Sequence, residues 1–368
     1  MPMQRRLFLA SLFGAAARAA SVKIERVELI QVVVRMKPGV VYSPDFGPTL
    51  DQRLVVFDTY PKFLIKLYAD NGMVGLGVTA REGSAADAQR TADFIKGKRM
   101  EELDNNLPEP STADGFEIAM FDLMGKSSGL PVCALLGGRL QSKVAVSYWT
   151  AQRTFDDLIK VGETAVAKGF RNLKFKARLG DPIEKQMAAV TKASPNLNFI
   201  VDFNSSYPDL ASFLPVAKRL EGYNLTIEDP FPKRLDWFRQ LRQRTTIPLA
   251  LTPTGPEQLV AAIKTDSVDI FNLGGNMREF VRQASVAEMA GIPCWHGSGV
   301  ELGIRDMSFI HAAAATRSCT IGSDTLSYLR QHSLITPPFE PVNGYLEVPT
   351  KPGLGVELDE DAVKRFRV

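Results

Sequence analysis

The stretch that decides the fold runs from Asn172 to Pro230 and holds three short apolar runs, NLKFKA (172–177), NFIVDFN (198–204) and LTIEDP (225–230). Each run ends in charged or polar residues and is followed by a segment with helical spacing. The charged positions recur in even steps, with 28 residues from Lys174 to Asp202 and 26 from Asp202 to Glu228. Steps of this size equal one strand–helix unit, so the stretch predicts parallel strands joined by helices.

The same texture continues on both sides of this stretch. Five further runs follow the rule: VAVSYW (144–149), PLALT (248–252), DIFNL (269–273), PCWHG (293–297) and CTIGSD (319–324). Such units in succession predict an α/β fold with a TIM-like (β/α) barrel, which we place over residues 136–335. A doubly wound open sheet is the alternative, but no Gly-rich fingerprint follows the first strand.

The residues before the barrel have a different pattern. Residues 22–35 and 53–80 alternate apolar and polar side chains around a turn at 70–72, which predicts a small antiparallel sheet. A helical stretch completes an α+β unit, whose bounds we place at 21–135. The last residues, 336–368, return to Pro/Gly turns and short strand-like pieces. We expect this C-terminal segment to pack back on the first domain.

The first twenty residues, MPMQRRLFLASLFGAAARAA, have the composition of an export signal. The pair Arg5-Arg6, an apolar run and a small-residue end precede Ser21, and the pattern resembles a twin-arginine signal. We therefore expect a periplasmic or secreted protein; a disordered or helical N-terminal arm is the alternative. The apolar run is too short to span a bilayer, so we expect no membrane insertion after signal removal.

Composition excludes several classes of protein. With 45% hydrophobic and 23% charged residues, the chain has the make-up of an ordinary globular protein. The signal segment holds three arginines and no acid, so the rest has 41 basic and 41 acidic residues, a balance that gives no support for nucleic-acid binding. Cys133, Cys294 and Cys319 lie among apolar residues, and we interpret them as core thiols rather than a disulfide framework.

Charged side chains stand at the C-terminal ends of the expected strands, where a barrel carries its active site. Lys174 and Lys176 are two residues apart, so both point to the same face of their strand. If that face is the barrel interior, burial and mutual repulsion lower their pKa values and make one a usable base; solvated lysines at a strand edge are the alternative. Asp202 and Glu228 end the next two strands, and their oxygens suit Mg²⁺.

Residues 22–368 resemble the enolase superfamily, in its mandelate racemase/muconate lactonizing branch. The motifs that carry the resemblance are GFEIAMFDLMGKSSGLPVCALLGG, LKFKA, VDFN, IEDP, AEMAGIP, GSGVELGI and NGYLEVPTKPGLGVELDED. The resemblance implies an N-terminal α+β capping domain over a (β/α)₇β barrel. It also implies chemistry that begins by removing the proton α to a carboxylate, with Mg²⁺ stabilising the enediolate.

The resemblance further implies roles for single residues. Lys176 is then the base on one face of the substrate, while Lys174 lowers the pKa of Lys176 and contacts the substrate carboxylate. Asp202 and Glu228 are the first two metal ligands. Asn204, at the end of the same run as Asp202, is a candidate substrate contact.

Position 252 departs from the family pattern. The third metal ligand of this family is an acid at the end of the fifth strand, and 24 residues past Glu228 the register leads to Thr252. A Thr hydroxyl is a neutral, weak ligand, so we expect the affinity for Mg²⁺ to fall substantially. We keep Thr252 as a candidate contact for substrate or water.

The second base of the lactonizing and epimerase groups is also missing, because no lysine follows the DIFNL run until after the seventh strand. His296 sits where the racemase group carries a histidine base and is the candidate replacement; a hydrogen-bonded structural histidine beside Trp295 is the alternative. Glu301, in GVELGI, matches a glutamate of the family that helps to orient substrate or metal-bound groups; a cap of the following helix is the alternative. Tyr42 lies in the expected specificity loop, residues 36–52.

Three functions remain open. In the first, the protein is an isomerase or lyase that acts on a small carboxylic acid by isomerisation, epimerisation, dehydration or cycloisomerisation. In the second, the barrel has lost catalysis and serves as a periplasmic binding or structural protein. In the third, the lysines pair with Asp202 and Glu228 in a site rebuilt without metal. The resemblance also leads us to expect a homo-oligomer.

Overall fold

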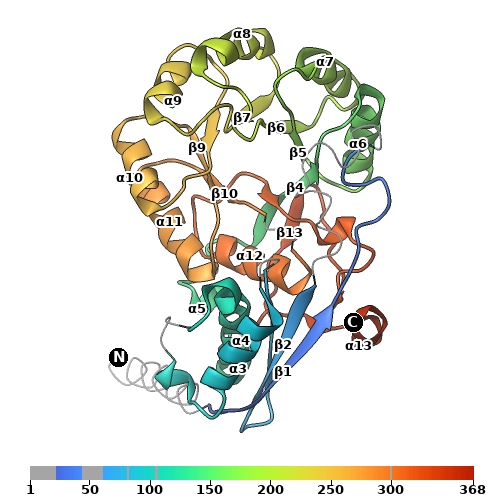
Figure 1. The fold of residues 1–368 in the computed structure, drawn as a ribbon, viewed down its shortest axis with the longest axis vertical. Coiled ribbons are helices and arrows are strands. Elements are labelled where there is room, and N and C mark those ends of the chain that lie inside the picture. The colour runs from blue at the N-terminus through green and yellow to red at the C-terminus, as the bar shows by residue number, and fades with distance from the viewer. Residues whose placement is uncertain (1–21, 44–60, 81–82, 104–106, 299–300) are drawn as a thin grey trace, which may run out of the picture.

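The computed structural model describes residues 22–43, 61–80, 83–103, 107–298 and 301–368 (Figure 1). The expected export signal at residues 1–20 and most of the expected specificity loop lie outside these ranges. Figure 1 shows a large unit, in which helices surround a set of strands, above a smaller unit of strands and helices.

The large unit is a barrel of parallel strands. Its strands are β4 (Lys143–Thr150), β5 (Asn172–Lys176), β6 (Asn198–Asp202), β7 (Leu225–Glu228), β8 (Leu249–Leu251), β9 (Ile270–Leu273), β10 (Cys294–His296) and β11 (Ser323–Asp324). Their order in the sheet is β10-β9-β8-β7-β6-β5-β4-β11. Backbone hydrogen bonds from Cys294 N to Ser318 O (2.8 Å) and from Ile321 N to Cys294 O (3.3 Å) join the two ends of this order. The sheet therefore closes on itself.

Helices cover the outside of the barrel (Figure 1). They are α6 (Phe155–Ala167), α7 (Ile183–Ala193), α8 (Leu210–Leu220), α9 (Leu235–Arg242), α10 (Pro256–Lys264), α11 (Met277–Met289) and α12 (Ile304–Ala314). Asn276 caps α11 by accepting a hydrogen bond from the backbone N–H of Glu279. Outward-facing strand residues such as Phe175, Val201 and Leu251 are buried in the main apolar core. Because side chains alternate along a strand, the residues between these outward-facing positions face the barrel axis.

The smaller unit is a three-stranded antiparallel sheet packed on helices. Its elements are β1 (Ile24–Val32), β2 (Lys62–Ala69), β3 (Val74–Val78), α3 (Ala85–Ile95), η3 (Met100–Glu102), α4 (Pro110–Ser128) and α5 (Val132–Leu135). Two glycines let β3 lie directly on α4. A Cβ at Gly77 would lie 2.1 Å from the carbonyl oxygen of Gly115, and one at Gly75 would lie 2.3 Å from that of Ala119. Side chains at these two positions would push the sheet off the helix.

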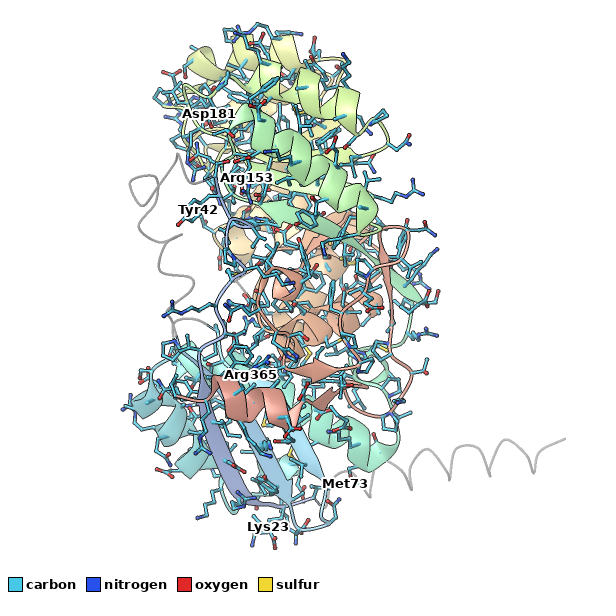
Figure 2. All side chains as sticks on the ribbon, turned by 90° about the vertical axis from the view of Figure 1, so that its right-hand side faces the viewer. Lys23, Tyr42, Met73, Arg153, Asp181 and Arg365 are labelled. Carbon is cyan, nitrogen blue, oxygen red and sulfur yellow. The ribbon has the colours of Figure 1, made fainter. Side chains whose placement is uncertain are left out.

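The C-terminal segment contacts both units. It contains β12 (Ile335–Thr336), β13 (Tyr345–Glu347), β14 (Glu357–Leu358) and α13 (Glu360–Phe366), and η4 (Ser327–Leu329) precedes it. β13 pairs antiparallel with the first residues of β4. α13 lies beside the small sheet, where Glu360 forms an ion pair of 2.7 Å with Lys66 of β2. Figure 2 shows Arg365 of α13 in front of the strands of this sheet.

The predicted fold class is confirmed. The chain forms an α/β structure in which a (β/α)₇β barrel carries an N-terminal α+β cap, and the solved structures to which it is similar, described below, share this fold. In the described part of the chain, no helix has the length and apolar character needed to cross a bilayer. The three cysteines are free and buried, as expected for core thiols.

Candidate active site

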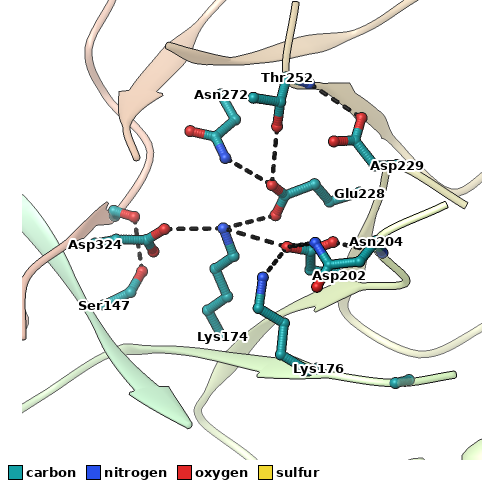
Figure 3. A network of polar contacts seen from close by, with 12 residues as sticks. Ser147, Lys174, Lys176, Asp202, Asn204, Glu228, Asp229, Thr252, Asn272 and Asp324 are labelled. Atoms are coloured by element: carbon teal, nitrogen blue, oxygen red, sulfur yellow. Dashed lines mark hydrogen bonds and ion pairs between the residues drawn. The ribbon is translucent and has the colours of Figure 1, made fainter. Parts of the chain in front are cut away.

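Inward-facing charged side chains meet at the C-terminal ends of neighbouring barrel strands (Figure 3). Lys176 of β5 is in register with Asp202 of β6, which is in register with Glu228 of β7. Lys174 is two residues before Lys176 and faces the same side, and Asp324 reaches the group from β11. We call these residues, Lys174, Lys176, Asp202, Glu228 and Asp324, the lysine–carboxylate cluster.

Lys174 is the centre of the cluster. Its Nζ lies 2.8 Å from Glu228 Oε2, 2.8 Å from Asp324 Oδ2 and 3.9 Å from Asp202 Oδ2. Burial acts to lower the pKa of Lys174, but the three carboxylates outweigh it and raise the pKa well above its ordinary value. The expectation that the pKa of Lys174 is lowered is therefore wrong, because the neighbouring carboxylates hold the side chain as an ammonium ion. Such a group suits charge stabilisation and not proton abstraction.

Asp202 is held in place from two sides. Lys176 Nζ forms a close ion pair with Asp202 Oδ2. Asn204 adopts a positive φ of 46°, and from there its backbone N–H donates to Asp202 Oδ1 (2.8 Å) and its side-chain amide to Oδ2 (3.0 Å). Burial acts to raise the pKa of Asp202, but the ammonium groups of Lys176 and Lys174 outweigh it, so the pKa lies below its ordinary value. Asp202 is therefore ionised, with Asn204 as its support.

Glu228 is held by neutral donors on the side away from Lys174. Its Oε1 accepts hydrogen bonds from the Thr252 hydroxyl (3.2 Å) and from the Asn272 side-chain amide (2.6 Å). Burial and the negative charge of Asp202 raise the pKa of Glu228 to about 7. Thr252, which stands where the family has its acidic third metal ligand, thus positions Glu228 by hydrogen bonding.

Asp229 fixes the loop that carries Thr252. Its Oδ1 accepts a hydrogen bond from the backbone N–H of Thr252 (3.1 Å), and its Oδ2 pairs with Lys233 at 3.0 Å. Lys233 also donates to the carbonyl oxygen of Thr252 at 2.6 Å. The backbone at position 252 is therefore set from both sides, which orients the hydroxyl towards Glu228.

His296 points away from the cluster. Its ring stacks on Phe309 of α12 with centroids 3.5 Å apart and lies 4.6 Å from the ring of Phe280 on α11. Burial lowers its pKa to about 3, and its Nδ1 lies 2.7 Å from the carbonyl oxygen of Gly297, to which it donates as a neutral ring. Trp295, the preceding residue, faces the barrel axis, with its ring 5.3 Å from Lys174 Nζ. The structure therefore does not bring His296 together with the lysines.

Glu301 and Tyr42 occupy other places. The Glu301 carboxylate accepts a hydrogen bond from the Ser298 hydroxyl and lies 3.9 Å from Arg305 Nε. Arg305 in turn pairs with Asp114 on α4, so these contacts place Glu301 at the junction of cap and barrel.

Tyr42 is half-buried in a segment held along the end of β4, where Val41 O accepts a hydrogen bond from Ala151 N at 2.7 Å. Figure 2 shows Tyr42 near Arg153 at this end.

The chain is similar to known proteins of one superfamily. The family model described as Enolase C-terminal domain-like matches residues 157–362, more than half of the chain. Over 261 residues, the chain is 33% identical to the N-succinylamino acid racemase of Thermus thermophilus, covering 68% of this chain and 69% of the racemase. It belongs to the mandelate racemase/muconate lactonizing branch of the enolase superfamily. The predicted resemblance is confirmed.

Two further superfamily members are similar to it. The o-succinylbenzoate synthase of Geobacillus kaustophilus is 31% identical over 264 residues, which is 68% of each chain. A solved structure of an enolase from Thermobispora bispora, complexed with magnesium and formate, superposes with a TM-score of 0.78 at 22% identity and covers 94% of this chain and 92% of its own. Relatives that are racemases and synthases support isomerase or lyase chemistry in general terms, without naming a reaction.

Sequence reasoning missed two residues of this candidate site. Asp324 contributes a carboxylate to Lys174, and Asn272 donates to Glu228. The run CTIGSD ends in an acid at the end of an expected strand, so the rule that pointed to Asp202 and Glu228 also pointed to Asp324. Asn272 has the same signal in a weaker form, because it lies near the end of its run and carries an amide instead of a charge.

Gly297 keeps Asn272 in position. A Cβ at Gly297 would lie 2.2 Å from Asn272 Oδ1, and Asn272 is buried and bound to Glu228. We expect Gly297→Ala to force the amide off Glu228 and to lower the free energy of unfolding by roughly 1–3 kcal/mol, measured by urea denaturation. Adding Asn272→Ser to Gly297→Ala removes the clash, so the double variant should lose less than the sum of the two single losses. Strictly additive losses would contradict this account.

Proposed function

We propose that this enolase superfamily member removes the proton α to the carboxylate of a small organic acid, with Lys176 as the base. The observation that carries the proposal is the exposure of Lys176. Its side chain is 14% exposed, whereas the side chains of Lys174, Asp202, Glu228 and Asp324 are at most 3% exposed. A molecule that enters the barrel mouth therefore meets the Lys176 amine before the rest of the cluster.

The proposed step is a proton transfer with a balanced outcome. The α-proton passes to the neutral amine of Lys176, and the electron pair of the C–H bond moves into the carboxyl group to give an enediolate. The Lys174 ammonium donates a hydrogen bond to the carboxylate oxygens, where the new charge accumulates. The intermediate then either recovers a proton at carbon or expels a leaving group from the β-carbon, which gives isomerisation or elimination.

The strand ends opposite Lys176 favour chemistry on one face of the substrate. In the described residues, β9 presents the Asn272 amide and β10 is followed by the inward-facing Gly297, while His296 points outward. Neither Asn272 nor Gly297 accepts a proton. Dehydration or cycloisomerisation, which need one base, therefore fit this site better than racemisation.

Buried polar atoms without partners supply contacts for a ligand. Asp324 Oδ1, Asn272 Oδ1 and Trp295 Nε1 have no hydrogen-bond partner among the described residues. Such groups cost free energy unless a bound molecule or water satisfies them. Two acceptors and one donor in the same barrel suit a small acid that also carries a hydroxyl or amide group.

Replacing Lys176 with methionine is expected to lower proton exchange by on the order of 10²-fold or more, because the base is lost while the length of the side chain is kept. The assay is exchange of the α-proton for deuterium in D₂O, followed by proton NMR over a panel of small acids that includes N-succinylamino acids. Lys192→Met, on the exposed face of α7, is the matched control and should exchange as the wild type does. Equal exchange in the Lys176 and Lys192 variants would refute Lys176 as base.

A second function, ligand binding without catalysis, is favoured by the ion pairs of both lysines. An ammonium held by Asp202 is not a base until it loses its proton. If no acid of the panel exchanges its α-proton at any pH from 6 to 10 while one of them raises the melting temperature, the binding function replaces the enzymatic one.

We also infer export and self-association, which rest on the sequence alone. The Arg-Arg pair and apolar run of residues 1–20 support a periplasmic or secreted location. N-terminal sequencing of protein from the periplasm tests the cleavage, and light scattering tests the proposed homo-oligomer.

A further inference from the structure

The acids of the cluster do not make the donor set of a divalent-cation site. Asp202 and Glu228 stand in register on β6 and β7, but the next strand end brings the neutral Thr252. Across the described ranges, no group of three or more Asp, Glu, His or Cys side chains is arranged to hold a metal ion. Mg²⁺ requires several oxygen ligands around one point, and carboxylates are the ones that set its affinity.

Most carboxylate oxygens of Asp202, Glu228 and Asp324 already face N–H or O–H donors, whereas Asp324 Oδ1 has no hydrogen-bond partner among the described residues. Glu228 Oε1 accepts from Thr252 and Asn272, and Oε2 faces the Lys174 ammonium at 2.8 Å. Asp202 Oδ1 accepts from the backbone of Asn204, and Oδ2 accepts from the Asn204 amide and pairs with Lys176. A divalent cation would have to displace these N–H and O–H groups. The residues present therefore do not fit Mg²⁺.

The ammonium of Lys174 lies where the carboxylates converge. Its contacts of 2.8 Å to Glu228 and Asp324 and 3.9 Å to Asp202 come from three different strands of the barrel. The lysine is 2% exposed, so water does not screen these interactions. A buried cation surrounded by carboxylates on different strands has the electrostatic role that a metal ion has in a metal-dependent barrel.

We propose that the Lys174 ammonium takes the place of the divalent cation, so that the protein binds no Mg²⁺ or Mn²⁺ in this site and acts without one. This inference rests on the proposed function, since it concerns how the enediolate is stabilised. Lys174 then donates hydrogen bonds to the substrate carboxylate and carries the balancing charge. Asp324 and Glu228 keep the ammonium in position.

The proposal is tested by binding of Mn²⁺, which electron paramagnetic resonance detects directly. Wild-type protein should bind no Mn²⁺ at 1 mM. Lys174→Met removes the ammonium that Asp202, Glu228 and Asp324 all contact and leaves these three acids without a shared counter-ion. The variant should therefore bind Mn²⁺ at least tenfold more tightly than the wild type. Lys176→Met is the matched control, because Lys176 contacts only one of the three acids, and it should not gain binding.

Two results would overturn the proposal. One is micromolar Mn²⁺ binding by the wild type that Asp202→Asn abolishes. The other is a Lys174→Met variant that, folded by circular dichroism, binds Mn²⁺ no better than Lys176→Met. If the Lys174 variant does not fold, the wild-type titration still decides the question.

Proton exchange in EDTA separates this proposal from the proposed function. Exchange that continues in EDTA and is unchanged by added Mg²⁺ supports both. Exchange that requires Mg²⁺ overturns the metal-free site and leaves the function standing. If the wild type binds no Mn²⁺ and exchanges no proton either in EDTA or with added Mg²⁺, the proposed function is overturned. The assignment of Lys174 to the place of the cation then still stands.

Discussion

Lys174→Met is expected to lower the free energy of unfolding by roughly 3–5 kcal/mol at pH 7, because it removes a cation that three buried carboxylates share. Leaving such charges without a counter-ion costs more than the ion pair itself contributes. The measurement is urea denaturation in buffer with EDTA. As the pH falls and the carboxylates protonate, the loss should shrink.

Lys176→Met provides the comparison within the same cluster. Lys176 is more exposed and pairs with Asp202 only, and Asp202 retains its hydrogen bonds from Asn204. Its loss should therefore be clearly smaller than that of Lys174→Met. If the two variants were equally stable, Lys174 would not be the centre of the cluster.

Lys62→Met is expected to raise the free energy of unfolding by roughly 3–5 kcal/mol at pH 7. Lys62 begins β2, the central strand of the small sheet, is 4% exposed, and its Nζ has no hydrogen-bond partner among the described residues. Burial lowers its pKa from 10.5 to about 7, with further lowering by Arg330 and Arg305 that outweighs Glu301 and Asp114. Methionine has a similar shape and carries no charge to bury.

The pH dependence gives this prediction its sign. Between pH 7 and 10.5 the folded chain holds Lys62 neutral while the unfolded chain binds the proton, so this group makes the wild type more stable as the pH rises. The advantage of Lys62→Met should therefore be largest at pH 7 or below and should shrink towards pH 10. Urea denaturation at pH 6, 7, 8 and 9 checks this. A variant less stable than the wild type at pH 7 would mean that Lys62 contacts a group that satisfies its charge.

The sequence predicted the barrel and half of its site because both follow from repetition. Even steps between strand ends led to Lys174, Lys176, Asp202, Glu228 and Thr252, and parallel strands place such positions together regardless of the loops between them. The sequence did not predict which of these side chains contact one another. Lys174 meets Asp324 across 150 residues, and no local pattern links them.

His296 shows why strand faces are hard to predict for short strands. β10 is three residues long. If the assignment of inward-facing and outward-facing positions is shifted by one residue, His296 instead of Trp295 faces the barrel axis. The motif comparison placed a histidine near the family's second base, but the chain turns Trp295 inward and leaves Gly297 beside Asn272. The register of β10 depends on the packing of the whole ring of strands, and this register determines that Trp295, and not His296, faces the barrel axis.

The seam between β11 and β4 has a consequence for how the chain folds. β11 is two residues long and pairs with the middle of β4, and β13 pairs with Lys143, Val144 and Ala145 at the start of the same strand. The seam of the barrel is thus completed by β11, whose residues follow their partners in β4 by 177 positions (Ser323 with Val146, Asp324 with Ser147). Such distant contacts stabilise the fold only after a large loss of chain entropy. The emerging polypeptide must keep this edge of β4 open until β11 has been made.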